Sequence, residues 1–581
     1  MTGRSRRRPR RAAPAPGPGQ VSAARSSSRA SADGATGPED DGSLLPGPVL
    51  WPAAEWVVAA VGIVIAVVVW AVAPTAGNYD SVLDLVWARE LLAGHAPGFE
   101  AYAASTPHPA WLALGVPVVA IFGDGGDRVL VLVSALSLAF LAAATVRIGR
   151  VLGEAIAGAD DGRRARTGLA TGLVAGALTL SSFAFLLLAA RGYLDVPFLA
   201  LVAWAGALIL ADARQRPQQP TFDVGRRTAA DGDVGRVAPP TWRRPAVLLA
   251  LAGLLRPEAW VLAGLYWLWC TARGRWAAAD DPLDGRAAHL ALVLAAPLLW
   301  AAMDLAVTGN PLHSLTATSQ LAEDLGRDRG ILRAPRVLVS ALGGQARPPV
   351  AAAGLVGLAI VLLGSRIGLA RVGRRVAVVV LALLGGGVAT FLAAGVGGLS
   401  LLPRYLTVPV VGITVLAALA ATGWMALPVE HRWRRPWALL VVAGVVLGVG
   451  GYVALKRDAI SRLGSELRFL ADTRRDVRAL IDDPRVEAGR RCGPISLPTY
   501  RLVPEIRLQL DVDGTRVLAR SDPRAQRLGV TRGGVAITVA EGKAAKRYGR
   551  ADGVPRSTQP APPGFRAVAR RGAFTAWVRC G

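Results

Sequence analysis

The chain has 581 residues, of which 52% are hydrophobic, and its mean hydropathy is +0.39. A water-soluble protein of this size needs more charge on its surface, so these values and the recurring long apolar runs predict a polytopic α-helical membrane protein. The formal net charge of +25 raises the question of nucleic-acid binding. Most arginines, however, lie in the N-terminal tail and between apolar runs, where they orient a membrane protein. We therefore expect a lipid bilayer as partner and no nucleic acid.

Three regions follow from the composition along the chain. Residues 1–50 contain an arginine cluster among Pro, Gly and Ser and show no apolar periodicity, which predicts a disordered basic tail. Residues 51–455 contain the apolar runs and predict a transmembrane domain. Residues 456–581 are mixed and charged, and predict a small α/β domain.

We predict about eleven transmembrane helices. In chain order they lie near 56–74, 128–146, 168–188, 196–211, two short spans within 246–270, then 289–306, 350–363, 376–394, 406–425 and 438–455. The apolar run 110–122 is short for a hydrocarbon core of ~30 Å, so we interpret it as a re-entrant or juxtamembrane helix. With this choice every loop on the cytoplasmic side is rich in arginine. The prediction is a multi-pass protein of the cell membrane with a cytoplasmic N-terminus and an extracytoplasmic C-terminal domain.

The C-terminal region begins with an amphipathic helix at 460–481, followed by short strand-like runs at 494–497, 515–519, 535–540 and 574–580. Cys492 opens the strand-containing part and Cys580 nearly closes it. An extracytoplasmic compartment permits disulfides, so this pair is a disulfide candidate. Cys270 falls within an apolar run and is interpreted as a packed apolar residue.

Ionisable residues gather on the predicted outer side. The loop 75–127 follows the first span directly, and further charged residues stand at the ends of spans. The group comprises Asp80, Asp84, His95, His108, Arg191, Asp195, Arg256, Glu258, His313 and Arg404. A charge at the end of a span is usually an interface anchor, but three arginines and several acids on one face also suit a reaction site.

These features resemble the GT-C superfamily of integral-membrane glycosyltransferases. The resemblance rests on the early Asp80 after the first span, the Gly-His-Ala-Pro segment at 94–97 and the Pro-His-Pro-Ala-Trp segment at 107–111. Asp195, Arg256 and the Arg404-Tyr405 pair fit the same layout, and eleven spans with a C-terminal domain are similar to the actinobacterial members. The chain departs from the pattern of many members, which carry two adjacent acids in the first loop, because Asn78-Tyr79-Asp80 offers one.

The resemblance implies an inverting transfer of a hexose or pentose from a polyprenyl-phosphate carrier to a glycan, lipid or protein acceptor of the cell envelope. Attack by a sugar hydroxyl needs a carboxylate to take its proton, for which Asp80 or Asp84 is the candidate. The phosphate that leaves needs fixed cations, for which Arg256, Arg404 and Arg191 are candidates. His108, Asp195, Tyr405 and His313 are candidates for substrate binding. Asp195 or His313 would serve a divalent metal such as Mg²⁺ or Mn²⁺, although no spacing demands one.

Other interpretations stay open for several residues. Asp80 has the position of a helix cap, Asp84 that of a solvated helix residue, and His108 and His313 those of structural loop residues. The chain as a whole also suits a transporter or flippase, or an assembly protein, for lipid-linked envelope precursors. A transporter would favour paired charges near the bilayer midplane and inverted repeats, and the sequence contains neither.

Overall fold

The structure is a computed structural model that describes residues 54–214, 242–272 and 282–581, apart from 325, 541 and 550–559. The described residues belong to one compact unit. The predicted basic tail of residues 1–50 lies outside them.

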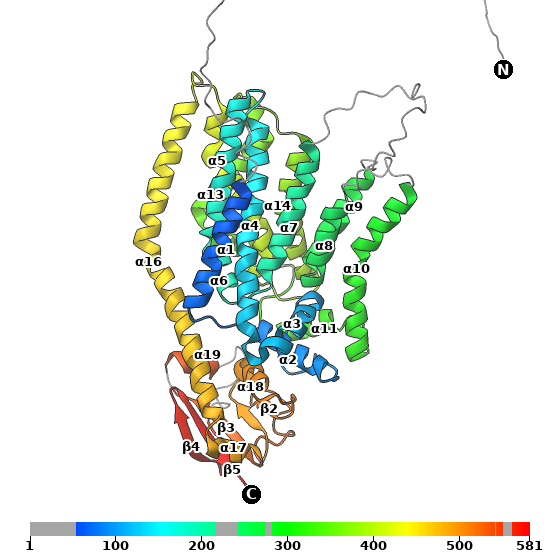
Figure 1. Cartoon of the computed structure of the whole chain (residues 1–581), viewed down its shortest axis with the longest axis vertical. Helices are drawn as coiled ribbons and strands as arrows, with labels where there is room; N and C mark the ends of the chain where they lie inside the picture. The colour runs from blue at the N-terminus through cyan, green and yellow to red at the C-terminus, as the bar shows by residue number, and fades with distance from the viewer. Residues whose placement is uncertain (1–53, 215–241, 273–281, 325, 541, 550–559) are drawn as a thin grey trace, which may run out of the picture. The chain divides into compact units, whose positions relative to one another are not determined.

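Helices make up most of the described chain (Figure 1). Those of the first half are α1 (Ala54–Val72), α2 (Tyr79–Leu92), α3 (Pro109–Phe122), α4 (Gly126–Ile156), α5 (Asp161–Leu180), α6 (Phe183–Ala190), α7 (Asp195–Arg214), α8 (Arg243–Leu255) and α9 (Glu258–Ala272). Those that follow are α10 (Pro282–Thr308), α11 (His313–Asp324), α12 (Ala334–Ala346), α13 (Pro348–Leu363), α14 (Arg374–Val396), α15 (Thr407–Thr422) and α16 (Arg434–Ile481). Short 3-10 turns, η2 (Gly123–Gly125) and η4 (Pro403–Leu406), precede α4 and α15.

Six segments of the described chain are long and apolar enough to cross a membrane, or seven if the bent pair α5 and α6 forms one span. Large apolar side chains stay exposed on several of them, including Val64 at 61% and Leu298 at 62%. Exposed apolar residues in such density suit a lipid environment.

This number does not confirm the eleven predicted spans. The helices α8 and α9 have 13 and 15 residues, which gives lengths of roughly 20 Å at 1.5 Å per residue, against a hydrocarbon core of ~30 Å. They meet at Arg256-Pro257, where the sequence predicts the break, because a proline disfavours helical geometry in the residue before it. The helix α3 is similarly short at 14 residues, so its re-entrant position stays a prediction.

Close packing of α4 against α5 uses small residues at the contact. A Cβ atom added to Gly172 would lie 2.6 Å from the carbonyl oxygen of Val146, and one added to Gly153 would lie 2.7 Å from that of Thr167. Only glycine lets the two backbones approach this closely, as at other helix contacts in membranes.

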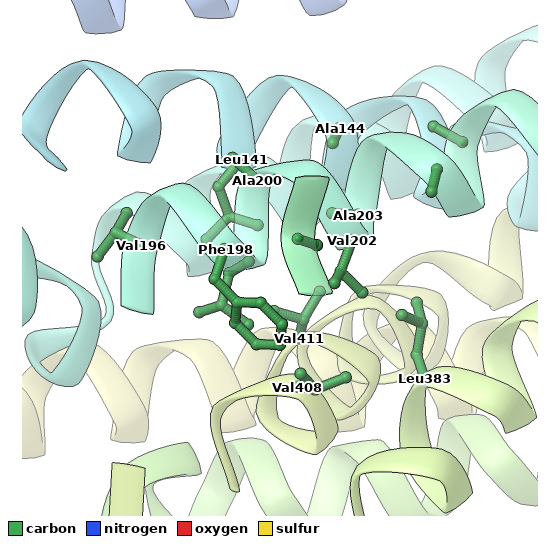
Figure 2. Packing of buried hydrophobic residues seen from close by; sticks show 14 of the residues in the cluster. Leu141, Ala144, Val196, Phe198, Ala200, Val202, Ala203, Leu383, Val408 and Val411 are labelled. Atoms are coloured by element: carbon green, nitrogen blue, oxygen red, sulfur yellow. The ribbon is translucent and has the colours of Figure 1, made fainter. Parts of the chain in front are cut away.

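The largest apolar cluster extends through much of the helical part, and one section of it lies where α7 packs among α4, α14 and α15 (Figure 2). The labelled residues are Leu141 and Ala144 from α4, Val196, Phe198, Ala200, Val202 and Ala203 from α7, Leu383 from α14, and Val408 and Val411 from α15. Asp195 opens α7 beside this cluster and Arg404 lies just before α15. The packed core therefore fixes the backbone positions of two candidate site residues.

The C-terminal region contains a small sheet accompanied by helices, which agrees with the predicted α/β character; its status as a separate domain stays a prediction. Its five-stranded sheet has the order β2-β1-β3-β5-β4, with strands β1 (Ile495–Leu497), β2 (Val517–Ala519), β3 (Gly534–Val539), β4 (Arg566–Arg571) and β5 (Phe574–Arg579). The strand β1 pairs in parallel with β2 and β3, whereas β5 pairs antiparallel with β3 and β4. Helices α17 (Pro484–Arg490), α18 (Val503–Leu510) and α19 (Lys543–Tyr548) accompany the sheet.

The helix α16 has 48 residues and joins the predicted last span to the predicted amphipathic helix without a break. It leads from the helical part towards the sheet (Figure 1). The strand-containing part is closed by a disulfide between Cys492 and Cys580, whose Cα atoms are 5.2 Å apart. Cys270 is a buried free cysteine.

Ion pairs attach the C-terminal domain to α2 and to the start of α4. Arg474 of α16 bonds Asp127 and Glu505, and Arg507 of α18 bonds Glu90 of α2 at 2.5 Å. The Arg507 side chain is only 3% exposed. These ion pairs join the C-terminal domain to α2 and to the start of α4. Removing one partner would leave a buried charge without compensation and would be costly.

Candidate active site

The start of α2 is held against the turn between α6 and α7. The Asn78 side chain caps α2 by accepting hydrogen bonds from the backbone N–H groups of Asp80 and Ser81. The same side chain donates to the carbonyl oxygens of Arg191 and Gly192, at 3.1 and 3.2 Å. Asn78, and not Asp80, is therefore the helix cap, and the Asp80 carboxylate is left for another partner.

The backbone geometry of this turn requires glycine at position 192. Its φ of +66° lies in the left-handed region, and an added Cβ would lie 3.1 Å from Val131. Only glycine adopts this conformation without strain. The turn places Arg191 and Tyr193 beside the N-terminus of α2.

The partner of Asp80 is Arg404 from η4, whose Nη1 donates to Asp80 Oδ2 at 2.9 Å. Burial alone would raise the pKa of Asp80, but the charge of Arg404 and its hydrogen bond outweigh burial, so the pKa falls below its ordinary value of 3.8. The carboxylate is consequently ionised at neutral pH.

Asp80 and Arg404 stand between two cavities and line both. The first, of about 460 Å³, is walled by apolar residues of the bundle such as Trp260, Trp300 and Ala393, and we name it the membrane cavity. The second, of about 670 Å³, extends to the C-terminal domain and includes Arg191, Arg327, Tyr500, Arg501 and Arg547 among its walls; we name it the basic cavity. Asn78, Ser105, Thr106, Tyr193, Thr318 and Tyr405 also line both cavities.

Arg256 lines the membrane cavity, and its guanidinium group forms ion pairs with two carboxylates. Its guanidinium bonds Asp195 of α7 and Glu258 at the start of α9, and its side chain is 5% exposed. The guanidinium carbon also lies 5.0 Å from the centre of the Tyr405 ring. The two acids compensate the charge of Arg256, so the side chain is held rigidly and is already neutralised.

His108 is neutral in this setting. It precedes α3, lines the membrane cavity and packs edge-on against Trp300 with ring centres 5.6 Å apart. Burial and, to a lesser extent, the charge of Arg256 lower the pKa of His108 to about 3. The Nδ1 atom is buried and has no hydrogen-bond partner among the described residues. The ring can therefore accept a hydrogen bond from a ligand, but it does not carry charge at neutral pH.

Asp84 and His313 line neither cavity. Asp84 is fully buried one turn after Asp80, so it is not a solvated helix residue, and both of its carboxyl oxygens lack a partner among the described residues. Burial, and then the charge of Asp80, raise the pKa of Asp84 well above its ordinary value. His313 opens α11, and its backbone N–H bonds Asn310.

The structure thus brings together Asp80, Arg404, Tyr405 and Arg191 on one side, and Asp195, Arg256 and His108 next to them. Among the described residues, no group of three or more His, Cys, Asp or Glu could hold a metal ion. Sequence reasoning missed Arg327, Tyr500, Arg501 and Arg547, which line the basic cavity. The sequence contains one indication of their role: these residues lie in segments that are predicted to be on the same side of the membrane as Asp80.

Comparison with protein-family models gave no match, and no curated protein sequence matched the chain. Among solved structures, the chain is similar to the Archaeoglobus fulgidus oligosaccharyltransferase in its apo form, with 12% sequence identity and a TM-score of 0.47. The similarity covers 84% of this chain and 70% of that chain. At this identity and TM-score the likeness assigns neither an activity nor a substrate.

Proposed function

We propose that this chain is an inverting glycosyltransferase of the cell membrane. It moves a sugar from a polyprenyl-phosphate carrier to an acceptor of the cell envelope, on the side of the bilayer that carries the C-terminal domain. The observation on which the proposal rests is an ionised carboxylate, Asp80, that lies at the junction of two cavities beside Arg404. The resemblance of the sequence to the GT-C superfamily points to the same chemistry.

The two cavities suit two different substrates. The membrane cavity has apolar walls from the bundle, which suit the prenyl chain of a donor. The basic cavity is walled in part by the C-terminal domain, and it suits a polar acceptor. Donor and acceptor would then meet at Asp80, because this residue faces both spaces. Holding two reactants in this way lowers the barrier by removing the need for a random encounter.

In the proposed reaction, Asp80 takes the proton of the acceptor hydroxyl while the hydroxyl oxygen attacks the anomeric carbon. The bond between the anomeric carbon and the phosphate oxygen breaks, and its electron pair leaves with the polyprenyl phosphate. A single displacement of this kind inverts the anomeric centre.

Arg404 is the principal candidate to stabilise the leaving phosphate, since it stands beside the base at the same junction. Arg256 is a second candidate, because the N–H groups that do not bond Asp195 or Glu258 can donate to the phosphate. His108 and Tyr405 are proposed to bind substrate in the membrane cavity. We propose no metal role for Asp195, because its carboxylate is paired with Arg256 and no group of three or more His, Cys, Asp or Glu among the described residues could hold a metal ion. His313 and Asp84 have no proposed contact, because neither lines the membrane cavity or the basic cavity.

The test is transfer from radiolabelled polyprenyl-phosphate sugars, tried as a panel, to membranes or lipid extracts by the purified chain. Asp80→Asn keeps the size of the side chain but removes the base, and should reduce transfer at least about a hundredfold. Glu100→Gln is the matched control, because Glu100 is an exposed acid of the same loop that lines neither cavity. Unchanged transfer in Asp80→Asn, or equal losses in both variants, would refute the assignment.

A further inference from the structure

The basic cavity has more positive charge than the proposed transfer needs. Six arginines line it, against two acids, Asp80 and Glu505. Five of these arginines, Arg191, Arg327, Arg474, Arg501 and Arg547, line the basic cavity and not the membrane cavity. Guanidinium groups in one partly buried space repel each other unless negative charge is supplied.

Several of these charges are compensated within the protein. Arg404 bonds Asp80, Arg474 bonds Asp127 and Glu505, and Arg547 bonds Glu466. Arg191 and Arg327 differ from them, because neither has a carboxylate partner among the described residues. The surplus therefore concentrates on Arg191 and Arg327.

Arg191 and Arg404 both lie next to the aromatic ring of Tyr193. The guanidinium carbon of each lies 5.9 Å from the centre of the Tyr193 ring. The Nε atom of each is buried and lacks a hydrogen-bond partner within the described part of the chain. A buried N–H donor without a partner is costly, and an anion bound beside Arg191 in the basic cavity would satisfy its Nε atom.

The remaining arginines surround this pair. Arg547 lies close enough to Arg191 for the two charges to repel, and its carbonyl oxygen accepts a hydrogen bond of 2.6 Å from Arg501. Arg327 lies close enough to Asp80 to contribute to the low pKa of that carboxyl. Residues of the bundle and of the C-terminal domain thus converge on the same space next to the proposed base.

We infer that the basic cavity binds a negatively charged group of the acceptor, and that the acceptor is a phosphate-bearing glycan. This inference rests on the proposed function, since it names the substrate class for the cavity that Asp80 faces. Arg191 and Arg327 hold the phosphate, with Arg547 and Arg501 behind them. The hydroxyl that receives the sugar then lies within a short reach of Asp80. Neutral glycans leave the surplus positive charge uncompensated and bind more weakly.

Binding can be measured without any transfer reaction. The purified full chain, in a neutral and phosphate-free detergent, is titrated with glucose 6-phosphate as probe and, separately, with glucose as the uncharged comparison. Binding of both sugars is followed by ¹H saturation-transfer difference NMR. Arg191→Gln and Arg327→Gln should each weaken binding of glucose 6-phosphate about tenfold, as expected for the loss of a charge-assisted hydrogen bond. The matched control is Arg532→Gln, which makes the same change at an exposed arginine outside both cavities.

Asp80→Asn gives a result of opposite sign. It removes the negative charge that repels an anion and frees Arg404, so it should tighten binding of glucose 6-phosphate while it abolishes transfer. A merely damaged fold would weaken both. The binding result and the transfer result therefore separate the two proposals: loss of transfer without selective phosphate binding would leave the glycosyltransferase proposal in place and overturn this one.

The source of the phosphate is decided by competition with geranyl phosphate, a short analogue of the donor. We expect glucose 6-phosphate and geranyl phosphate to bind together, because the two cavities are distinct. Displacement of one by the other would assign the arginines to the donor phosphate and overturn the inference. Equal binding of glucose and glucose 6-phosphate, or an unchanged affinity in both Arg191→Gln and Arg327→Gln, would also overturn it.

Discussion

Arg404 donates to Asp80 at 2.9 Å across a sequence separation of 324 residues, and this ion pair joins the N-terminus of α2 to the turn before α15. The pair faces both cavities. It therefore has two tasks in the proposed reaction, since it keeps the carboxylate ionised and places a cation beside the leaving phosphate.

The first prediction concerns this pair. Arg404→Gln should reduce transfer by about two to three orders of magnitude, the usual loss when a donor to a developing charge is removed. Arg404→Lys should recover part of the activity, because it restores charge without the fork of the guanidinium. Asp80→Asn combined with Arg404→Gln should be no worse than Asp80→Asn alone, since the two act as a unit. Fully additive losses in this cycle would show that the residues act separately.

The second prediction concerns the acid side of the pH profile. Asp80 must be ionised to act as a base, and Arg404 lowers its pKa below 3.8. Activity should therefore stay constant from neutral pH down to about pH 5. In Arg404→Gln the burial of Asp80 is no longer opposed by this cation, so the acid limb of kcat/KM should move to higher pH. The profile of residual transfer checks this, and an acid limb at the same pH in both proteins would contradict it.

The third prediction concerns His108. Its pKa of about 3 means that the imidazole stays neutral from pH 5 to pH 8. We expect no inflection in kcat/KM near pH 6.5, the ordinary value for histidine. His108→Asn should keep the same shape of profile while it raises the KM of the donor. An inflection near pH 6.5 in the parent chain that disappears in His108→Asn would show that the ring titrates.

The fourth prediction concerns Asp84, whose buried carboxyl has a strongly raised pKa. A carboxyl with a raised folded-state pKa costs stability as pH rises above its unfolded value, because only the unfolded chain ionises freely. Asp84→Asn removes this cost. The variant should therefore unfold at a higher temperature than the parent at pH 8, with a smaller difference at pH 5. A difference that shrinks as the pH rises would mean that Asp84 is ionised in the folded protein.

Short sequence patterns predict many elements of the fold. The Arg256-Pro257 break, four of the five strands and the candidate pair Cys492 and Cys580 are all features of short segments. The strand β4 was missed because its sequence, RAVARR, is polar on an exposed edge and lacks the apolar alternation that indicates a strand. The last predicted span ends at residue 455, but the helix α16 continues to Ile481. A change from apolar to charged residues alters the environment of a helix and does not end it.

The site depended on contacts that no local pattern contains. Arg327, Arg501 and Arg547 line the basic cavity together with Asp80, although they come from the loop before α12 and from the C-terminal region. The sequence NYDS offers several residues able to cap a helix, and only the bonds of Asn78 to Arg191 and Gly192 show which one does so. Electrostatic roles follow from such placements: Arg404 is paired with the Asp80 carboxylate, whereas Arg191 has no carboxylate partner among the residues that the structure describes.

The fifth prediction concerns the disulfide. Cys492 and Cys580 are 88 residues apart, so the bond restricts a long loop in the unfolded chain and should stabilise the C-terminal domain by about 4 kcal/mol. Replacing both cysteines by alanine should increase the rate at which trypsin cuts within 492–580. Reductant should speed cleavage of the parent chain to the same rate and leave the double variant unchanged, because the remaining Cys270 is buried. The basic cavity takes part of its wall from this domain, so binding of glucose 6-phosphate should weaken together with protease resistance. Equal cleavage of the parent and the double variant under oxidising conditions would show that the bond does not stabilise the domain.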